Sequence, residues 1–493
     1  MLFYLIIINF FLIFILEQII MYEGIPASYP ATFFYNLSKL QGAFSKNLIK
    51  VTADRVTASP NELTNIRLPI GALINAQSLA LWFKVTTSGT NATVPTRYSS
   101  SFIKRMSLTM NNVSVQIIQD YNLVYNILAD HTNKNYTKGI GGEMLDNSII
   151  WSEGAGASDQ TAISGQNALL AAVTNKEYQM CINNFIGFFG SASTKILPLD
   201  KMGELVVSIE WAPNFDVLCG TGEASSTTYT ASDTYSVSDI YVTTEAYSFS
   251  DDTYYKSLDR DLKIGFDDFT VNRFASTTKA TGINVTTYLS AGSIDYLMGT
   301  CVVPQSVPKP MVAYGSLGTG ASDSVVANVF KFLSDPESFA GNASATSTDN
   351  IYGDGFFASL AMQRCMQHLD KSQWSINNKA LNYAPLNKYE VFNNNLLSLG
   401  YENVDMSANG FHAGIVSLLH YFKYYGVCMQ SLELIDKDQF YISGLSSSGS
   451  SCSINWVCSF TGGSSNTMSV TPVIIAKMSK VLNVGSGRAI SVE

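Results

Sequence analysis

Charged residues are scarce in this sequence. Only 14% of its 493 residues are Asp, Glu, Lys or Arg, whereas an ordinary soluble domain has roughly 25%. The net charge is −9, and the longest basic run is the pair Lys104-Arg105. Proteins that bind nucleic acids need clustered positive charge to contact the phosphates. Sequence-specific binding of nucleic acid by the folded protein is therefore not expected.

Motifs of common catalytic and metal sites are also missing. The sequence has no G-x-x-x-x-G-K-[ST], no H-E-x-x-H and no G-x-S-x-G. Of its four histidines, only His412 and His420 have a spacing that places both on one side of a helix, which makes them the best metal pair. Two hydrogen-bonded histidines on a helix face are the favoured interpretation. We therefore predict no catalytic, cofactor-binding or metal-binding residue and no enzyme activity.

Two pairs of adjacent acidic residues, Asp251-Asp252 and Asp267-Asp268, are the candidates for a glycosidase, which uses two carboxyl groups. Adjacent residues of a strand point to opposite faces of the sheet, and adjacent Asp residues are common in solvated loops. A glycosidase is therefore the last-ranked hypothesis.

The seven cysteines are scattered and form no C-x-x-C motif. The spacing of Cys452 and Cys458 matches no common zinc site. We interpret the cysteines as reduced and mostly buried, which favours an intracellular folding compartment. Six N-x-[ST] motifs do not establish secretion, because a sequence rich in Asn, Ser and Thr contains several by chance; they start at Asn36, Asn91, Asn112, Asn135, Asn284 and Asn342.

The first 20 residues are apolar except for Asn9 and Glu17-Gln18. Their length approaches that of a membrane span, but no Lys or Arg precedes Lys39, and a signal-peptide cleavage site is missing. Three interpretations stay open: a membrane anchor, an uncleaved signal, and translated sequence upstream of a start at Met21.

Hydrophobic residues are abundant, at 46%, so the chain must fold. Short apolar or alternating runs bounded by turn residues predict strands, most clearly at 79–85, 205–211, 235–242, 452–458 and 470–476. Apolar spacing predicts a helix over 120–130, and weaker patterns predict helices over 362–369 and 411–425. The fold is predicted to be mostly β, with a few short inserted helices.

The sequence also contains a coarse duplication. Each half has two apolar runs joined by an Asn-Asn turn, at Asn111-Asn112 and at Asn377-Asn378, and Asn tolerates the left-handed conformation that such hairpins need. We predict an apolar segment, an N-terminal arm and two β domains, with boundaries 1–20, 21–59, 60–258 and 259–493. Small polar residues predict long loops at 86–97, 152–166, 221–233 and 316–353.

The succession of segments resembles the double jelly-roll major capsid proteins of the adenovirus and tectivirus lineage, and is most similar to those of polinton-like viruses and virophages. The similar segments of the first half are 101–108 with the turn Asn111-Asn112, 115–130, 185–190, 195–209 and 237–242. Those of the second half are 373–385, 431–433, 442–446 and 481–492. The first 20 residues and the stretch 302–353 match nothing in the family.

The resemblance implies two tandem eight-stranded jelly-roll β-sandwiches. It implies a homotrimeric capsomer with a pseudo-sixfold outline that tiles an icosahedral DNA-virus shell, assembled inside the host cell. The expected partners are the chain itself, neighbouring capsomers, and penton and minor capsid proteins, while an internal membrane is left open. Scarce charge agrees with this role, because the cores of protein interfaces are poor in charged residues.

A different class of function stays open, a membrane-anchored cell-surface adhesin or lectin-like binding protein with a β-sandwich. It requires a functional N-terminal anchor and glycan-binding aromatic residues on one rim. Four dispersed cations at Lys39, Lys46, Lys50 and Arg55 would suit contact with an anionic membrane or a genome, but ordinary surface is the favoured interpretation.

Overall fold

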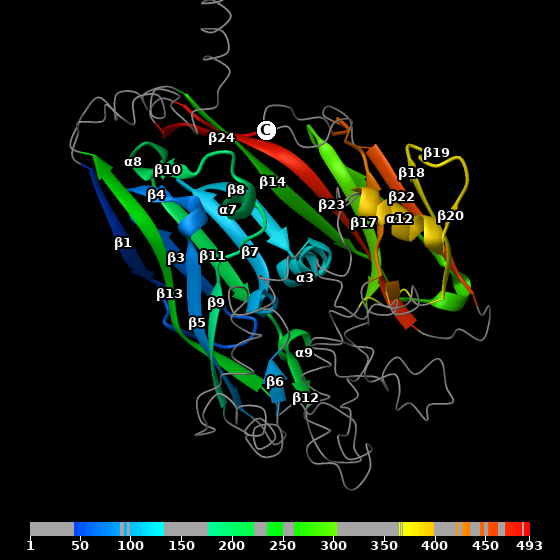
Figure 1. Cartoon of the computed structure of the whole chain (residues 1–493), viewed down its shortest axis with the longest axis horizontal. Coiled ribbons are helices and arrows are strands. Elements are labelled where there is room, and N and C mark those ends of the chain that lie inside the picture. The colour runs from blue at the N-terminus through cyan, green and yellow to red at the C-terminus, as the bar shows by residue number, and fades with distance from the viewer. Residues whose placement is uncertain are drawn as a thin grey trace, which may run out of the picture.

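The computed structural model shows two β-sandwiches packed side by side (Figure 1). It describes residues 44–88, 93–95, 99–132, 176–220, 234–249, 261–302, 364, 366, 368–398, 421–422, 426–433, 444–447, 452–461, 469–485 and 488–493. Within these residues, no helix is both long and apolar enough to cross a membrane.

The first sandwich consists of two antiparallel sheets. Sheet I contains β1 (Phe44–Thr52), β2 (Thr57–Ala58), β4 (Leu73–Asn75), β5 (Ala80–Ser88), β9 (Lys176–Ile182), β10 (Ile196–Pro198) and β13 (Thr234–Phe249). Sheet II contains β3 (Leu63–Leu68), β7 (Ile103–Met110), β8 (Val113–Gln119) and β11 (Leu205–Trp211). A separate pair is formed by β6 (Thr93–Pro95) and β12 (Leu218–Gly220).

The second sandwich is built in the same way. Sheet III contains β14 (Leu262–Arg273), β15 (Thr277–Thr278), β17 (Ile294–Val302), β21 (Cys428–Ser431), β23 (Ser469–Val484) and β24 (Ile490–Val492). Sheet IV contains β16 (Ile283–Leu289), β18 (Leu369–Ile376), β19 (Lys379–Ala380), β20 (Leu386–Asn387) and β22 (Cys452–Phe460).

The main strands of the two sandwiches pair in the same order. Sheets I and III contain the paths β1-β13-β5-β9 and β14-β23-β17-β21. Sheets II and IV contain β3-β11-β7-β8 and β16-β22-β18-β19. Numbered within each half, the strands pair as 1-8-3-6 and 2-7-4-5, which is a jelly-roll arrangement of two facing sheets. The remaining short strands are additions to this common plan.

The two predicted Asn-Asn hairpins match in detail. Asn111 and Asn112, between β7 and β8, have φ of 46° and 64°, and Asn377 and Asn378, between β18 and β19, have 49° and 62°. The Asn111 backbone N–H donates to Glu204 O, and Asn111 Oδ1 accepts from Glu204 N, both at 3.0 Å. Asn377 and Ser453 form the same reciprocal pair at 2.8 and 2.9 Å. The duplication therefore extends to the hydrogen bonds of equivalent turns.

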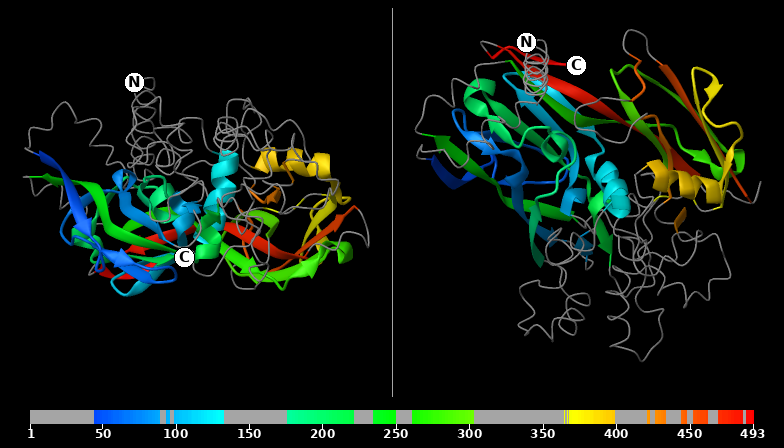
Figure 2. Two further views of the ribbon diagram at one scale, coloured as in Figure 1. Left: turned by 90° about the horizontal axis from the view of Figure 1, so that it is seen from below. Right: turned by 45° about the horizontal axis from the view of Figure 1, so that its top comes forward.

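Helices are short and lie between strands, as predicted. They are α3 (Tyr121–Thr132), α7 (Phe188–Ser191), α8 (Leu199–Met202), α9 (Asn214–Val217) and α12 (Lys388–Ser398), with 3-10 turns η2 (Ala76–Ser78), η3 (Ser99–Phe102) and η4 (Lys279–Thr281). The two longer helices, α3 and α12, each follow an Asn-Asn hairpin. Helix α3 lies at the middle of the molecule, and α12 lies across the second sandwich (Figures 1 and 2).

Sheet III separates two hydrophobic cores. On β17, Met298 and Val302 join the core of the first sandwich, whereas Leu297 and Cys301 join that of the second. Its nine residues are all buried, because both faces of the strand are covered, and such a strand has a nearly continuous apolar sequence. The first core therefore extends across the junction between the sandwiches.

Most strand predictions are confirmed, since the five clearest segments overlap β5, β11, β13, β22 and β23, and the helix at 120–130 is α3. The helix predicted over 362–369 is wrong in its described part, because Leu369 begins β18. Tyr421 and Phe422, the described residues of the segment 411–425, are helical.

The sequence does not predict strand β1, because apolar and polar residues do not alternate regularly along this mostly exposed segment. It lies within the range 21–59 that was predicted to be an arm, and it pairs with β13 along its whole length. Residues 1–20, the division at 258/259 and the predicted loops at 152–166, 221–233 and 316–353 lie outside the described residues. The five described cysteines are buried and form no disulfide among the described residues, as predicted: Cys181, Cys301, Cys428, Cys452 and Cys458.

Candidate functional site: the junction between the two sandwiches

Of the sequence candidates for chemistry, the structure describes Asp267 and Asp268. Asp251-Asp252, His412 and His420 lie outside the described residues. Asp267 and Asp268 are neighbours on β14, and each forms an ion pair with β23: Asp267 Oδ1 is 3.3 Å from Lys477 Nζ, and Asp268 Oδ2 is 2.6 Å from Lys480 Nζ. These acids are structural. Among the described residues, no three His, Cys, Asp or Glu side chains are grouped as metal ligands.

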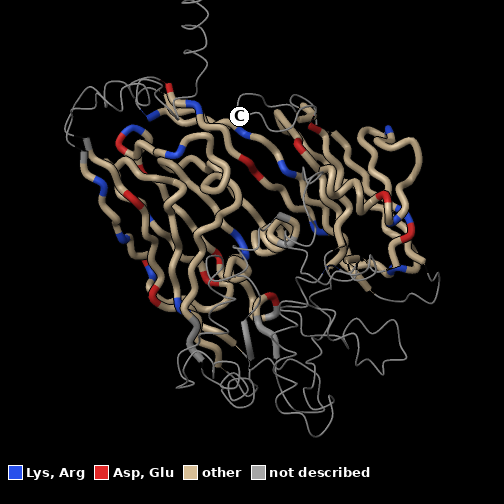
Figure 3. The backbone as a smooth tube through the Cα atoms, viewed as in Figure 1, with Lys and Arg blue, Asp and Glu red and all other residues tan. Residues whose placement is uncertain are grey.

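Several charged residues pair where the sandwiches meet. In Figure 3 acidic and basic positions lie close together where β14 and β23 pass the middle of the molecule. Three sets of contacts join the sandwiches there: bonds along the edge of β14, an ion network at the start of α3, and a chain of hydrogen bonds at its end.

The first sandwich covers the free edge of β14. One edge of this strand pairs with β23, and the other would expose backbone donors and acceptors that can recruit another strand. Ser193 Oγ accepts from Gly265 N at 3.0 Å, and Ser193 N donates to Gly265 O at 2.8 Å. Ser191 Oγ accepts from Asp267 N at 2.7 Å. The backbone groups of Gly265 and Asp267 on this edge are therefore bonded inside the chain.

Gln116 of β8 completes this edge. Its Nε2 donates to Asp267 O at 2.8 Å and to Asp268 Oδ1 at 2.9 Å, while its Oε1 accepts from Phe188 N at 2.8 Å. Gly187 approaches so closely that an added Cβ would lie 2.5 Å from Gln116 Oε1, and its φ of 76° also favours glycine. One buried side chain thus joins β8, α7 and β14.

An ion network lies where α3 begins. Asp120, with φ of 48°, accepts helix N–H groups through its backbone oxygen. Its carboxylate contacts Lys104 Nζ at 2.6 Å in its own sandwich and Arg273 Nε at 2.5 Å from β14. Burial raises the pKa of this carboxyl, but the attraction and hydrogen bonds of Lys104 and Arg273 outweigh it and hold the pKa below its usual value. The network therefore requires an ionised Asp120.

The end of α3 is joined to α12. His131 Nδ1 is 2.7 Å from Ile127 O, so that nitrogen carries the proton, because a carbonyl only accepts. In the neutral ring Nε2 then accepts from the Tyr421 hydroxyl at 2.9 Å, and this hydroxyl accepts from Asn395 Nδ2 of α12 at 2.8 Å. His131, Tyr421 and Asn395 thus satisfy one another's buried polar atoms across the junction.

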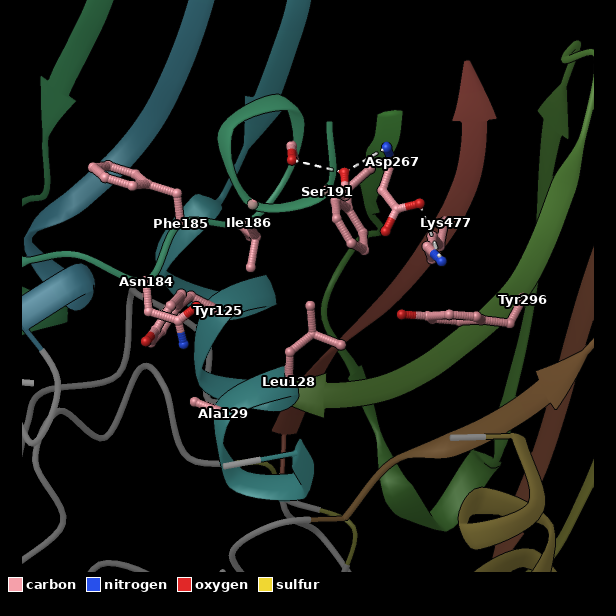
Figure 4. Close-up of a pocket in the computed structure, with 13 residues that line it drawn as sticks. Tyr125, Leu128, Ala129, Asn184, Phe185, Ile186, Ser191, Asp267, Tyr296 and Lys477 are labelled. Carbon is pink, nitrogen blue, oxygen red and sulfur yellow. Dashed lines mark hydrogen bonds and ion pairs between the residues drawn. The ribbon is translucent and has the colours of Figure 1, made fainter. Parts of the chain in front are cut away.

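A cavity of about 210 Å³ lies between these contacts (Figure 4). Tyr125 and Leu128 of α3 line one side, and Phe269 and Tyr296 of sheet III line the other. Lys477, only 1% exposed, contacts Asp267 and Asp295 and lies 5.2 Å from the ring of Tyr296. The ring centroids of Phe188, from the first sandwich, and Phe266, from the second, are 5.3 Å apart. The junction is thus a shared core, and it holds the two sandwiches in one arrangement.

Sequence analysis missed the residues of this junction. Gln116, Asp120, His131 and Ser191 carry no motif, and their partners are up to 290 positions away. The one available signal was the polar residues within otherwise apolar segments, since a buried polar side chain needs a partner.

No protein-family model matches the sequence, and no curated protein sequence matches it. The fold matches solved structures. PBCV-1 VP54, in a crystal structure fitted into a cryo-EM reconstruction of the virophage Sputnik, superposes with a TM-score of 0.56 at 14% identity, over 92% of this chain and 97% of that chain. A chain of a quasi-atomic model of the PBCV-1 virus capsid superposes with a TM-score of 0.56 at 13% identity, over 92% of this chain and 98% of that chain.

Both matches extend through the two sandwiches of each protein, so they concern the arrangement of the pair as well as each sandwich. The two matched proteins are double jelly-roll major capsid proteins. Together with the repeated strand order, these matches show that this chain has the double jelly-roll fold of those capsid proteins.

Proposed function

We propose that this chain is the major capsid protein of an icosahedral DNA virus. In this role it forms homotrimeric capsomers, in which six sandwiches make a pseudo-hexagonal tile, and the capsomers build the shell of the virion. The role is structural and involves no catalysis.

The observation that carries this proposal is the agreement over both sandwiches with capsid proteins along nearly the full length of each chain. A single jelly roll serves many functions. Two jelly rolls of equal topology, joined through a shared core, form a more specific unit. Such a unit supplies two similar edges per chain, so three copies can occupy a sixfold environment.

The finer features of the role belong to the same proposal. Penton and minor capsid proteins are the expected neighbours, and an internal membrane stays an open alternative. The first sandwich begins at β1 in this proposal, so an N-terminal arm is limited to 21–43, and the division between sandwiches falls within 250–260.

The cell-surface adhesin is the less supported alternative. The full-length matches are to capsid proteins. Two of the cations considered for membrane or genome contact are engaged on the face of sheet I: Lys46 with Glu245 at 2.6 Å, and Lys50 above the ring of Tyr241 at 3.7 Å.

Sedimentation and negative-stain microscopy of the purified chain test the proposal. We expect particles with three times the chain mass and a hexagonal outline, or closed shells. A folded protein that stays monomeric at micromolar concentration would contradict it, and isolated globules that bind glycans would favour the adhesin.

A further inference from the structure

Sheets I and III occupy equivalent places in the two sandwiches, but only one of them is covered. The outer face of sheet III lies in the shared core, where Lys477 is 1% exposed and Tyr296 is 8% exposed. On the outer face of sheet I, Leu48 is 73% exposed and the side chain of Lys46 is 51% exposed. If the two sandwiches were equivalent in their contacts, sheet I would be covered as sheet III is. Nothing in the described chain covers the outer face of sheet I in this way.

The outer face of sheet I combines three aromatic side chains and an exposed leucine with two lysines. We call it the β1 face and define it by Lys46, Leu48, Lys50, Trp82, Tyr241 and Tyr247. Trp82 stacks on Tyr241 with ring centroids 6.4 Å apart, and Lys50 lies over Tyr241 as Lys477 lies over Tyr296. Tyr and Trp are enriched in the buried centres of interfaces, and the stems of lysines pack on apolar surfaces.

The counterpart of α3 in the second sandwich, α12, packs on its own sandwich but leaves its outer side exposed in the described chain. Inside the chain, sheet III is covered by β8, α7 and α3 of the first sandwich, and every described side chain of α3 is buried except the half-buried Leu128. Its counterpart α12 buries Val391 and Asn395 but exposes Tyr389 at 63% and Leu397 at 47%.

The connection before α12 adds further exposed apolar side chains. Tyr383 is fully exposed and Leu381 is 36% exposed. Together with Tyr389 and Leu397 they define what we call the α12 face. A cluster of large exposed apolar side chains marks an interaction site more often than a free surface.

The two faces lie toward opposite ends of the molecule. In Figure 1 β1 lies at one end of the molecule and β19 and β20 lie at the other, while α12 lies between that second end and the internal junction. Different surfaces at opposite ends form head-to-tail contacts, which close into a ring when the rotation between copies permits.

We infer that the β1 face of one copy packs against the α12 face of the next. This contact repeats, between chains, the internal contact that α3 makes with sheet III. Internal and intermolecular junctions then alternate around the ring, and each of its sandwiches has one covered outer sheet. The inference rests on the proposed trimer, and it adds which surfaces meet and that they are different surfaces.

Separate substitutions on the two faces test this pairing. Leu48→Asp changes the β1 face, and the double variant Tyr389→Asp, Leu397→Asp changes the α12 face. Tyr288→Asp is the control, because Tyr288 is 69% exposed on β16, at the opposite edge of sheet IV from β19. Sedimentation gives the mass, and circular dichroism reports folding. We expect both face variants to be folded but to associate at least about 30-fold more weakly than wild type, because loss of a central interface residue weakens binding by about this factor. The control should stay trimeric.

Mixing the two face variants tests the head-to-tail geometry. Each variant keeps one intact face, so a mixture is expected to form dimers that contain one chain of each kind. A trimeric wild type whose face variants stay trimeric would overturn the inference and leave the proposed function intact. The inference would also be overturned if one face variant formed a dimer without the other, or if the control variant dissociated. A monomeric wild type would instead contradict the proposed function.

Discussion

Arg273, on the first strand of the second sandwich, contacts Asp120 at the start of α3 in the first, with Nε 2.5 Å from Oδ2. Lys104 approaches the other carboxylate oxygen of Asp120 at 2.6 Å. This carboxylate therefore ties the orientation of the two sandwiches to the ionisation of one buried group.

Replacement of Asp120 by Asn is expected to destabilise the protein. The change removes the carboxylate that pairs with Arg273 and leaves Lys104 with Asp216, at 3.1 Å, as its acidic partner. Loss of one partner of a buried ion pair costs about 2–4 kcal/mol of unfolding free energy when the cation stays partly solvated. Asn tolerates the left-handed backbone of this position. Urea unfolding, followed by tryptophan fluorescence at fixed protein concentration, measures the effect.

Asp239→Asn is the matched control for this change. Asp239 also has a positive φ, at 51°, and contacts Lys84 at 3.4 Å, but its side chain is 62% exposed. Exposed ion pairs contribute about 0–1 kcal/mol, so the control should stay close to wild type. Equal effects of the two substitutions would show that burial of the network has no role.

Acid should lower the free energy of unfolding by protonating Asp120. The folded pKa of Asp120 is lowered, so the unfolded chain binds the proton more tightly, and stability falls as pH falls. The contribution is complete above the unfolded pKa of about 3.9 and is lost as pH falls through the lower folded pKa. The difference in unfolding free energy between wild type and Asp120→Asn should therefore shrink below about pH 4. A difference that stays constant to pH 2 would contradict this assignment.

Replacement of Gln116 by Leu should remove the hydrogen bonds that join β8 and α7 to the edge of β14. The change keeps the approximate volume but leaves Phe188 N and the oxygens of Asp267 and Asp268 without this partner. A buried polar group that loses its partner costs about 1–3 kcal/mol. Asp268 keeps Lys480, so the loss at Phe188 N and Asp267 O is expected to total about 2–6 kcal/mol. Hydrogen exchange should also become faster at Phe188.

Gln77→Leu provides the comparison, because Gln77 is exposed on η2 and its side chain makes no hydrogen bond among the described residues. It should change stability by less than about 0.5 kcal/mol. Unchanged exchange at Phe188 in the Gln116 variant would mean that the side chain does not hold the α7 turn.

Replacement of Gly299 by Ala should strain the second core. A Cβ at this position of β17 would lie 2.6 Å from Trp456 Cε2 and 2.9 Å from Trp374, and these two buried rings are stacked at 5.7 Å. Overpacking of a core costs about 1–3 kcal/mol. Thermal unfolding and near-ultraviolet circular dichroism of the tryptophans measure it.

Gly265→Ala is the corresponding control in a strand of the same sheet. Its added Cβ would meet Ser193 at 3.9 Å, an ordinary contact, so the tryptophan signal should not change. A Gly299→Ala protein as stable as wild type would show that the tryptophans can move away without cost.

Local patterns in the sequence determined the class of fold. The strands over 205–211 and 452–458, the helix at 120–130 and both Asn-Asn turns follow from the alternation of apolar residues and from the backbone preferences of Asn. These signals involve residues a few positions apart, so they can be detected in the sequence alone. The internal duplication follows from the same signals.

The tertiary structure decided the junction, and with it the two uncovered faces. Gln116 and Asp268 are 152 positions apart, and His131 and Tyr421 are 290 apart, so no local pattern predicts that they meet. The sequence does not predict strand β1 for a related reason: apolar residues do not alternate along it, and β13, with which it pairs, is distant in the chain. Burial depends on what folds over a surface, and that depends on contacts between segments that are distant in the chain.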